Sequence, residues 1–430
     1  MSEVKLSPQT SGELLSRLLH MEDDRATASE LGNLSSTEWE DLLQQAERHQ
    51  VTPLLHRSLQ GAERRATVPA AVQERLEISY FQTAARSARI YAQLREMLEA
   101  LGKEQIPVIV LKGAYLAEIA YADVTLRPMR DVDLLARQAD LARAEQALLA
   151  LGYGPEEDDG GIDDYSTHRH LPPLARAGAA PVEIHWTIDD SGRFQIDVEG
   201  LWARARAVRI AGVETLALGT EDLLLHLCLH TAFQHRFRVA LRQIYDIAVV
   251  IRHHEKDLDW QALAEAARAS GLGKVCYYTL AVTDSLFGAG APAETLAALK
   301  EPGCEEGMVA VIRDYILLLG SQQVPIGLTE MLRQGGSGGR MGRLGLLLRS
   351  VFPPPDRLRE IYSLPPGSKA VYGYYFVRLW DLFARRGRFV SQLVLPGSEA
   401  RFAMETEAKA LIIQRQLGVP PMRPGKARGR

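Results

Sequence analysis

The chain has few cysteines and no strong charge bias. It contains three cysteines in 430 residues, Cys228, Cys276 and Cys304, which are widely spaced and odd in number. This usage argues against a disulfide framework and against a zinc site, and it favours a reducing compartment. The formal net charge of -4 gives no overall attraction to nucleic acid or to an anionic membrane. Any polyanion would therefore have to bind at a local basic patch.

Long apolar runs are also missing. Neither the N-terminal segment, residues 1–24, nor any later window has the apolar length of a signal peptide or of a membrane-spanning helix. Hydrophobic residues make up 46% of the chain and charged residues 24%, which is ordinary usage for globular domains with a large core. These features predict a soluble, cytoplasmic protein whose length fits two or three domains.

The periodicity of apolar residues changes along the chain. Helical spacing dominates the first hundred residues and includes a long amphipathic helix at 71–101. Short apolar runs at 106–111, 131–136 and 180–188 then alternate with helical patterns, which predicts a small sheet flanked by helices. Beyond about residue 220 the pattern is helical again.

These shifts divide the chain into four predicted regions. They are a helical N-terminal region at 1–102, an α/β core at 103–215, a helical C-terminal domain at 216–415 and a basic, disordered tail at 416–430.

Two aspartates stand one residue apart at the start of the second predicted strand, in LRPMRDVDLLA (126–136). Side chains at i and i+2 share one face of a strand, so Asp131 and Asp133 point the same way. Glu183, which shares a face with His185, joins them if the third strand lies beside the second. Three close carboxylates repel one another and favour a bound Mg²⁺ or Mn²⁺ ion. The alternative is a strand edge with solvated acids, because D-x-D is a common tripeptide.

Basic residues and a glycine precede these aspartates. Lys112 and Gly113 follow the first predicted strand, where an open backbone at a helix N-terminus and a lysine can receive a phosphate. Arg127 stands shortly before Asp131, where it could hold a triphosphate.

Histidines supply further candidates. His226 and His230 have the i, i+4 spacing of helical metal ligands, but no third ligand is evident, so His230 is interpreted either as lining the cleft or as a half-buried, hydrogen-bonded histidine. His168 and His170 lie in an acidic, glycine-rich loop and could touch nucleotide or acceptor, with a solvated loop as the alternative. His185 is the histidine best placed to reach the predicted acid cluster.

Asp246 lies among apolar residues of a predicted helix, where an unpaired acid is costly. The simpler interpretation is a salt bridge to Arg242 or Arg238. The alternative is a general base that accepts a proton from a substrate hydroxyl.

Taken together, these segments resemble a known family. IPVIVLKGAYLAEIAY, LRPMRDVDLLA, ALLALGY, HRHLPPL and VEIHW follow one another as in the nucleotidyltransferases of the DNA polymerase beta superfamily, specifically the bacterial branch labelled uncharacterised nucleotidyltransferase. The resemblance covers residues 35–255 and implies an α+β fold with a small mixed sheet. The roles it implies are phosphate contact for Gly113, binding of two Mg²⁺ ions for Asp131 and Asp133, and completion of the site for Glu183. The pair Gly113-Ala114 departs from the usual glycine-serine or glycine-glycine.

The resemblance also implies an activity. It is a magnesium-dependent transfer of a nucleoside monophosphate, with ATP as the expected donor and Mn²⁺ as a possible substitute, to a hydroxyl-type acceptor on a small molecule, peptide or protein, with release of pyrophosphate. Lys112, Gly113, Arg127 and His185 are the expected nucleotide-binding residues. A nucleotide-binding pseudoenzyme or interaction module with the same fold is the alternative, and neither a membrane nor nucleic acid is an expected partner.

Overall fold

A computed structural model describes residues 8–20, 29–155, 169–189, 191–305, 307–319, 373–375 and 399–418. The chain divides into two compact units, Met1–Ser321 and Gln322–Arg430. In the second unit the described residues are helical residues 373–375, α20 (Glu399–Leu417) and Gly418. His168 and all but the first residues of the predicted tail at 416–430 lie outside the described residues. The four-region division of the chain stays a prediction.

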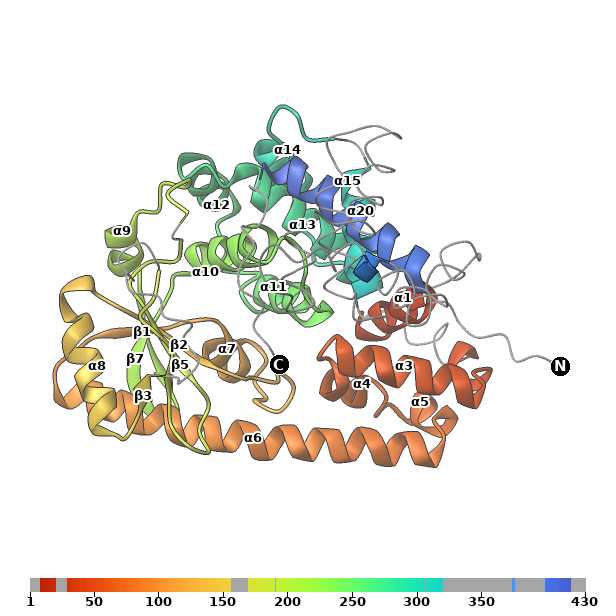
Figure 1. Cartoon of the computed structure of the whole chain (residues 1–430), viewed down its shortest axis with the longest axis horizontal. Coiled ribbons are helices and arrows are strands. Elements are labelled where there is room, and N and C mark those ends of the chain that lie inside the picture. The colour runs from red at the N-terminus through yellow and green to blue at the C-terminus, as the bar shows by residue number, and fades with distance from the viewer. Residues whose placement is uncertain are drawn as a thin grey trace. The chain divides into compact units, whose positions relative to one another are not determined.

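The first unit is built around a mixed sheet, and its described part has seven strands in the order β3-β4-β5-β2-β1-β7-β6 (Figure 1). The strands are β1 (Val108–Val110), β2 (Val132–Ala136), β3 (Gly154–Pro155), β4 (Leu174–Ala175), β5 (Val182–His185), β6 (Arg206–Ile210) and β7 (Val213–Ala217). Strand β1 is antiparallel to β2 and parallel to β7, while β2 is parallel to β5. The predicted α+β class with a small mixed sheet is confirmed.

The centre of the sheet follows from its sequence. Every residue of β1 and β2 is buried, as expected for short apolar strands covered on both faces. The three strands predicted at 106–111, 131–136 and 180–188 correspond to β1, β2 and β5.

The hairpin of β6 and β7 was not predicted. Its two-residue turn is Ala211-Gly212, and both residues have positive φ, 53° and 78°. Such a turn matches the twist of a hairpin, but alanine is an unusual choice for its first position. Charged residues in β6 and β7 also obscure the alternation of apolar and polar residues by which a strand is recognised in a sequence.

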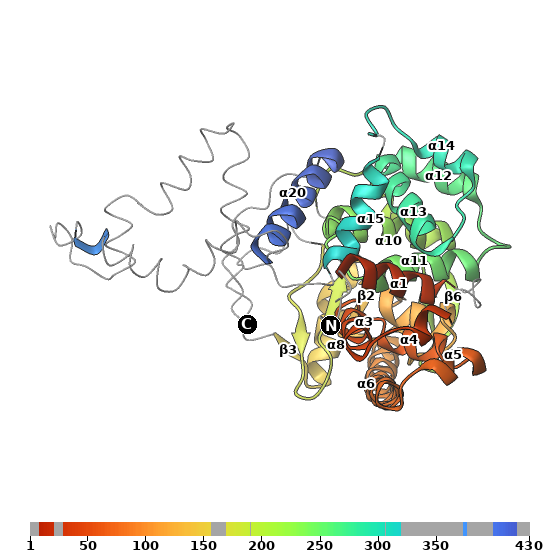
Figure 2. The same cartoon turned by 90° about the vertical axis from the view of Figure 1, so that its right-hand side faces the viewer.

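A long helix connects the N-terminal helices with the sheet. The helices of this region are α1 (Pro8–Leu19), α3 (Ser36–Arg48), α4 (Thr52–Ser58), α5 (Ala62–Thr67) and α6 (Ala70–Lys103). Helix α6 has 34 residues, contacts α4 and also contacts β7 and α8 (Leu141–Ala150). Figure 2 looks along α6 and shows α3, α4 and α5 beside it. One continuous helix therefore runs from the N-terminal helices to the sheet (Figure 1).

The remaining helices of the first unit pack around and above the sheet. They are α7 (Lys112–Tyr115), η1 (Leu116–Ala120), η2 (Gln138–Asp140), α8, α9 (Val198–Ala203), α10 (Thr220–Cys228), η3 (Leu229–Gln234), α11 (Leu241–His253), α12 (Trp260–Ala269), α13 (Gly273–Phe287), α14 (Ala293–Leu299) and α15 (Met308–Leu319). Both η1 and η3 are π-helical and continue an α-helix without a break. Among the described residues, no helix has the length and apolar content needed to cross a membrane.

Candidate active site

Two carboxylates lie opposite each other on β2 and β5. The parallel register of these strands pairs Asp133 directly with Glu183 and Leu135 with His185. Alternate residues share a face, so Asp133, Glu183 and His185 lie on one side of the sheet. The condition set for Glu183, that the third predicted strand lies beside the second, is met by this register.

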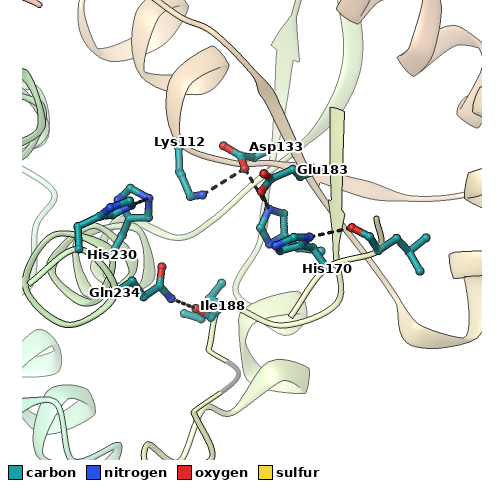
Figure 3. A network of polar contacts seen from close by, with 10 residues as sticks. Lys112, Asp133, His170, Glu183, Ile188, His230 and Gln234 are labelled. Atoms are coloured by element: carbon teal, nitrogen blue, oxygen red, sulfur yellow. Dashed lines mark hydrogen bonds and ion pairs between the residues drawn. The ribbon is translucent and has the colours of Figure 1, made fainter. Parts of the chain in front are cut away.

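Two nitrogen atoms contact the carboxylate of Asp133, and one of them also lies near Glu183 (Figure 3). Lys112 donates from Nζ to Asp133 Oδ1 at 3.1 Å, while His185 Nε2 lies 3.0 Å from the same oxygen and 3.3 Å from Glu183 Oε2. Asp133 and His185 are buried and Glu183 is half-buried. One potential ligand atom from each of Asp133, Glu183 and His185 falls within 4.8 Å of the others. This donor set of two oxygens and one nitrogen fits a single divalent cation.

The electrostatics of the cluster favour ionised carboxylates. Burial alone would raise the pKa of Asp133, but the positive charge of Lys112 and hydrogen bonding with His185 and Lys112 hold it well below its usual value. Burial likewise opposes ionisation of Glu183, yet its hydrogen bond with His185 lowers the pKa of this group. Both side chains are therefore negatively charged at neutral pH and need a cationic neighbour.

Asp131 lies at the edge of this arrangement. It precedes β2 and is exposed, and it is not one of the residues whose ligand atoms fall within 4.8 Å of one another. Strand β5 begins at Val182, opposite Val132, so Asp131 stands beyond the paired part of the two strands. Partial desolvation and the negative charge of Asp133 raise its pKa. Asp131 is thus close enough to Asp133 for the two carboxylates to interact electrostatically. The role of Asp131 as a metal ligand stays a prediction.

The turn after β1 brings Lys112 to the cluster. Leu111 donates its backbone N–H to the carbonyl of Asp133, and Lys112 follows with a positive φ of 40°. A left-handed backbone is unfavourable for lysine and is retained only where surrounding contacts enforce it. Here the conformation places the lysine side chain against Asp133, and α7 begins at the same residue.

Gly113 packs against the end of a buried arginine. A Cβ atom at this position would lie 2.7 Å from Nη1 of Arg127. Arg127 cannot easily retreat, because Nε and Nη2 each donate to a carboxylate oxygen of Asp246 at 2.9 Å. The turn after β1 therefore needs glycine because an arginine occupies the space that a methyl group would take.

We expect Gly113→Ala to destabilise the protein by about 1–3 kcal/mol, since the methyl group overpacks the guanidinium of Arg127. Denaturant unfolding measures the effect. Gly102→Ala is the matched control, because a Cβ at Gly102 meets nothing within 4 Å and alanine favours the helix. Equal or higher stability of Gly113→Ala relative to this control would contradict the overpacking argument.

Arg127 and Asp246 form a buried ion pair. Asp246 also accepts a hydrogen bond from Tyr121 Oη at 2.8 Å and lies 3.6 Å from Nη1 of Arg242. Burial alone would lower the pKa of Arg127, but the carboxylate of Asp246 raises it. The predicted salt bridge of Asp246 to Arg242 is present, while the main partner, Arg127, was not anticipated. With its oxygens engaged and its side chain buried, Asp246 is poorly placed to act as a general base.

A group of histidines borders the cluster. His230 Nε2 lies 3.0 Å from His235 Nε2, and Figure 3 shows His230 on the Lys112 side of the carboxylates and His170 beside Glu183. Burial and the charge of Lys112 hold the pKa of His230 well below its ordinary value and that of His235 at about 4. These rings are therefore neutral near pH 7 and can accept hydrogen bonds. His226 is buried as well, and its Nδ1 atom has no hydrogen-bond partner among the described residues.

His235 was missed in the sequence, and the π-helix explains why. In η3 the backbone N–H of His235 bonds to the carbonyl of His230, five residues earlier. A π-turn thus aligns residues at i and i+5, whereas the sequence analysis considered only the i, i+4 spacing of an α-helix.

A mixed sheet that carries a glycine turn after its first strand and facing acids on two neighbouring strands has the architecture of a nucleotidyltransferase core. A family model described as uncharacterised nucleotidyltransferase matches residues 35–288, more than half of the chain. The chain belongs to this family and is therefore a nucleotidyltransferase enzyme. No curated protein and no solved structure matches the chain.

Proposed function

We propose that this enzyme transfers a nucleoside monophosphate from an NTP, with ATP as the first candidate, to a hydroxyl group of a small molecule, peptide or protein. Divalent metal ions assist the reaction and pyrophosphate is released. The family assignment supports the reaction class. The wider kinship with the DNA polymerase beta superfamily, and with its bacterial branch, is part of the same proposal.

The observation that carries the proposal is the register of β2 and β5. It pairs Asp133 with Glu183 and gathers their oxygens with His185 Nε2 inside 4.8 Å. A purely structural pair of acids would gain little from such close placement, because like charges repel. A divalent cation makes the arrangement favourable and can stabilise charge on a transferring phosphoryl group.

The chain's residues divide the work as follows. Asp133, Glu183 and His185 would hold one metal ion, and Asp131, two residues before Asp133, would help to hold a second. Lys112, which contacts Asp133 at the edge of this cluster, would neutralise the phosphates of the NTP, and the turn at Gly113 would let its backbone approach them.

Arg127 is buried and lies against Gly113 in the same turn. Its Nη1 atom stands next to Gly113, while Nε and Nη2 donate to Asp246. Contact of Nη1 with a phosphate remains part of the proposal, and the Asp246 pair would keep it in position.

The reaction itself needs few groups. The acceptor oxygen attacks the α-phosphorus and forms a new P–O bond while the bond to the bridging oxygen breaks and pyrophosphate leaves. The acceptor proton passes to Glu183 or to water. Positioning and charge neutralisation supply most of the rate enhancement in such a transfer.

A radiolabel experiment tests this function. The protein is incubated with ATP labelled at the α-phosphate, a divalent metal and mixtures of candidate hydroxyl acceptors or proteins, and products are identified by mass. Transfer of label that is lost in Glu183→Gln supports the proposal. Tight ATP binding without any transfer or pyrophosphate release would instead identify a pseudoenzyme.

The nitrogen ligand predicts a preference for manganese. Imidazole binds Mn²⁺ better than it binds Mg²⁺, which prefers oxygen ligands. After removal of metal with a chelator, we expect half-maximal activity at an Mn²⁺ concentration at least about tenfold below that of Mg²⁺. In His185→Asp all the donor atoms are oxygen. The ratio of the Mg²⁺ concentration to the Mn²⁺ concentration at half-maximal activity should therefore be smaller than in the unmodified enzyme. An unchanged ratio in an active His185→Asp enzyme would show that His185 is not a ligand.

A further inference from the structure

A cavity apart from the candidate active site lies in the first unit, between the N-terminal helices and α11. Its volume is about 510 Å³, and its described lining comes from α1, α4, α5, the end of η1, the segment that follows η1, and α11. That lining includes none of the acids or histidines of the candidate active site. A volume of this size lies within the range of about 300–1,000 Å³ that is usual for small-molecule sites.

Much of the wall is apolar. Leu18, Leu54 and Leu126 line the cavity and are almost completely buried, and Val249 adds a further aliphatic side chain. Such a surface accommodates a hydrocarbon or ring portion of a ligand, because apolar groups leave water there favourably.

The charged groups in the described lining are all basic in type. Arg57, Arg64 and Arg252 face the cavity, and no aspartate or glutamate is among its described lining residues. Arg252 donates from Nη2 to the carbonyl of Phe287 at 2.5 Å, while its Nη1 atom is buried without a hydrogen-bond partner among the described residues. A buried guanidinium N–H without an acceptor is unfavourable, and an anionic ligand would satisfy it.

Two of these arginines converge on one wall residue. Burial raises the pKa of Tyr245, which also lines the cavity, and the positive charges of Arg252 and Arg57 oppose that rise. Both positive charges therefore act on the same hydroxyl group, and all three side chains line the cavity. Tyr121 contributes its ring to the lining, but its hydroxyl group is already bonded to Asp246.

We propose that this cavity is a second ligand site, which binds a small molecule with an apolar body and one anionic group, either a carboxylate or a phosphate ester. The anionic group pairs with Arg252 and Arg57, and the apolar body lies against the leucines and Val249. This site goes beyond the nucleotidyltransferase function and does not depend on it.

Direct binding to the full chain, in the absence of nucleotide, tests the proposal. Decanoate, decyl phosphate and the neutral decanol are titrated by calorimetry, the two acids below their micellar concentrations and decanol below its solubility limit. We expect at least one acid to bind at least about tenfold more tightly than decanol, since only the acids can use the arginines. The tighter acid identifies the anionic group, carboxylate or phosphate.

Two variants and a control distinguish the contribution of the arginine charge to binding from that of the space in the cavity. Arg57 is exposed, so Arg57→Gln should fold normally and weaken binding of the acid at least about fivefold without changing that of decanol. Val249→Trp fills the cavity and should weaken all three probes, after its folding has been checked by circular dichroism. Arg89→Gln, an exposed change on α6 outside the described lining, should bind like the unmodified protein.

Three results would overturn the site. They are no binding of either acid, decanol binding as tightly as the acids, or undiminished acid binding in Arg57→Gln. The last result decides the matter even if Val249→Trp fails to fold.

Discussion

Asp133→Asn is expected to lower nucleotidyl transfer by at least about 10³-fold, because it removes a charged oxygen ligand at the centre of the proposed site. It should also destabilise the protein by about 2 kcal/mol. Lys112 and His185 both contact Asp133 Oδ1, and the lowered pKa of Asp133 shows that the folded protein favours its charged form. Steady-state kinetics and denaturant unfolding measure the two effects.

Asp131→Asn is the matched comparison. The pKa of Asp131 is raised by partial desolvation and by the charge of Asp133, so loss of its own charge should leave stability unchanged or about 0.5 kcal/mol higher. If it binds the second metal, it too should lose most activity. A simple view of two equivalent, repelling aspartates would predict stabilisation by either substitution. Opposite stability changes for the two variants therefore distinguish the structure from that view, whereas a stabilised Asp133→Asn would contradict the contacts described for it.

The second large effect is expected at the buried pair of Arg127 and Asp246. Removing either partner alone leaves the other charge buried, so Arg127→Met and Asp246→Leu should each cost about 3–5 kcal/mol. The double variant should be less destabilised than the sum of the singles by more than about 2 kcal/mol. Denaturant unfolding of the four proteins completes the cycle.

An exposed pair serves as the control for this cycle. Arg137 Nη1 lies 2.9 Å from Glu199 Oε2 in a similar contact, but the Glu199 side chain is exposed and that of Arg137 is only partly buried, whereas Arg127 and Asp246 are both buried. The same cycle there should give a coupling below about 1 kcal/mol. Additive losses at Arg127 and Asp246 would mean that the two groups do not stabilise each other, despite their short contacts.

The central strands and the acidic residues of the candidate site could be predicted from the sequence. Short apolar runs between helical segments predict β1, β2 and β5, because strands covered on both faces must be apolar throughout. The alternation rule then assigns Asp133 and Glu183 to defined faces without any coordinates. The family resemblance added the reaction class, which the family match now supports.

The contacts that the candidate residues make with one another could not be predicted from the sequence. Arg127 was predicted from its position before Asp131 to contact phosphate, yet its main partner is Asp246, 119 residues away. His185 takes a place beside Asp133 and Glu183 because the strands are parallel and in register, and the same pairing ends before Asp131. Similarly, the partnership of His230 with His235 depends on a π-turn that has no simple pattern in the residue types.

The range over which each interaction acts explains why some features could be predicted from the sequence and others could not. Residue order alone indicates the strands β1, β2 and β5 and many of the helices, though not β6 and β7, and it shows which side chains of a strand share a face, since these features depend on backbone geometry over a few residues. Which acid meets which cation depends instead on strand register and on helices brought together from distant segments. Those long-range contacts placed Lys112 and His185 on Asp133, buried Arg127 against Asp246, and lined a basic cavity with arginines from three separate helices.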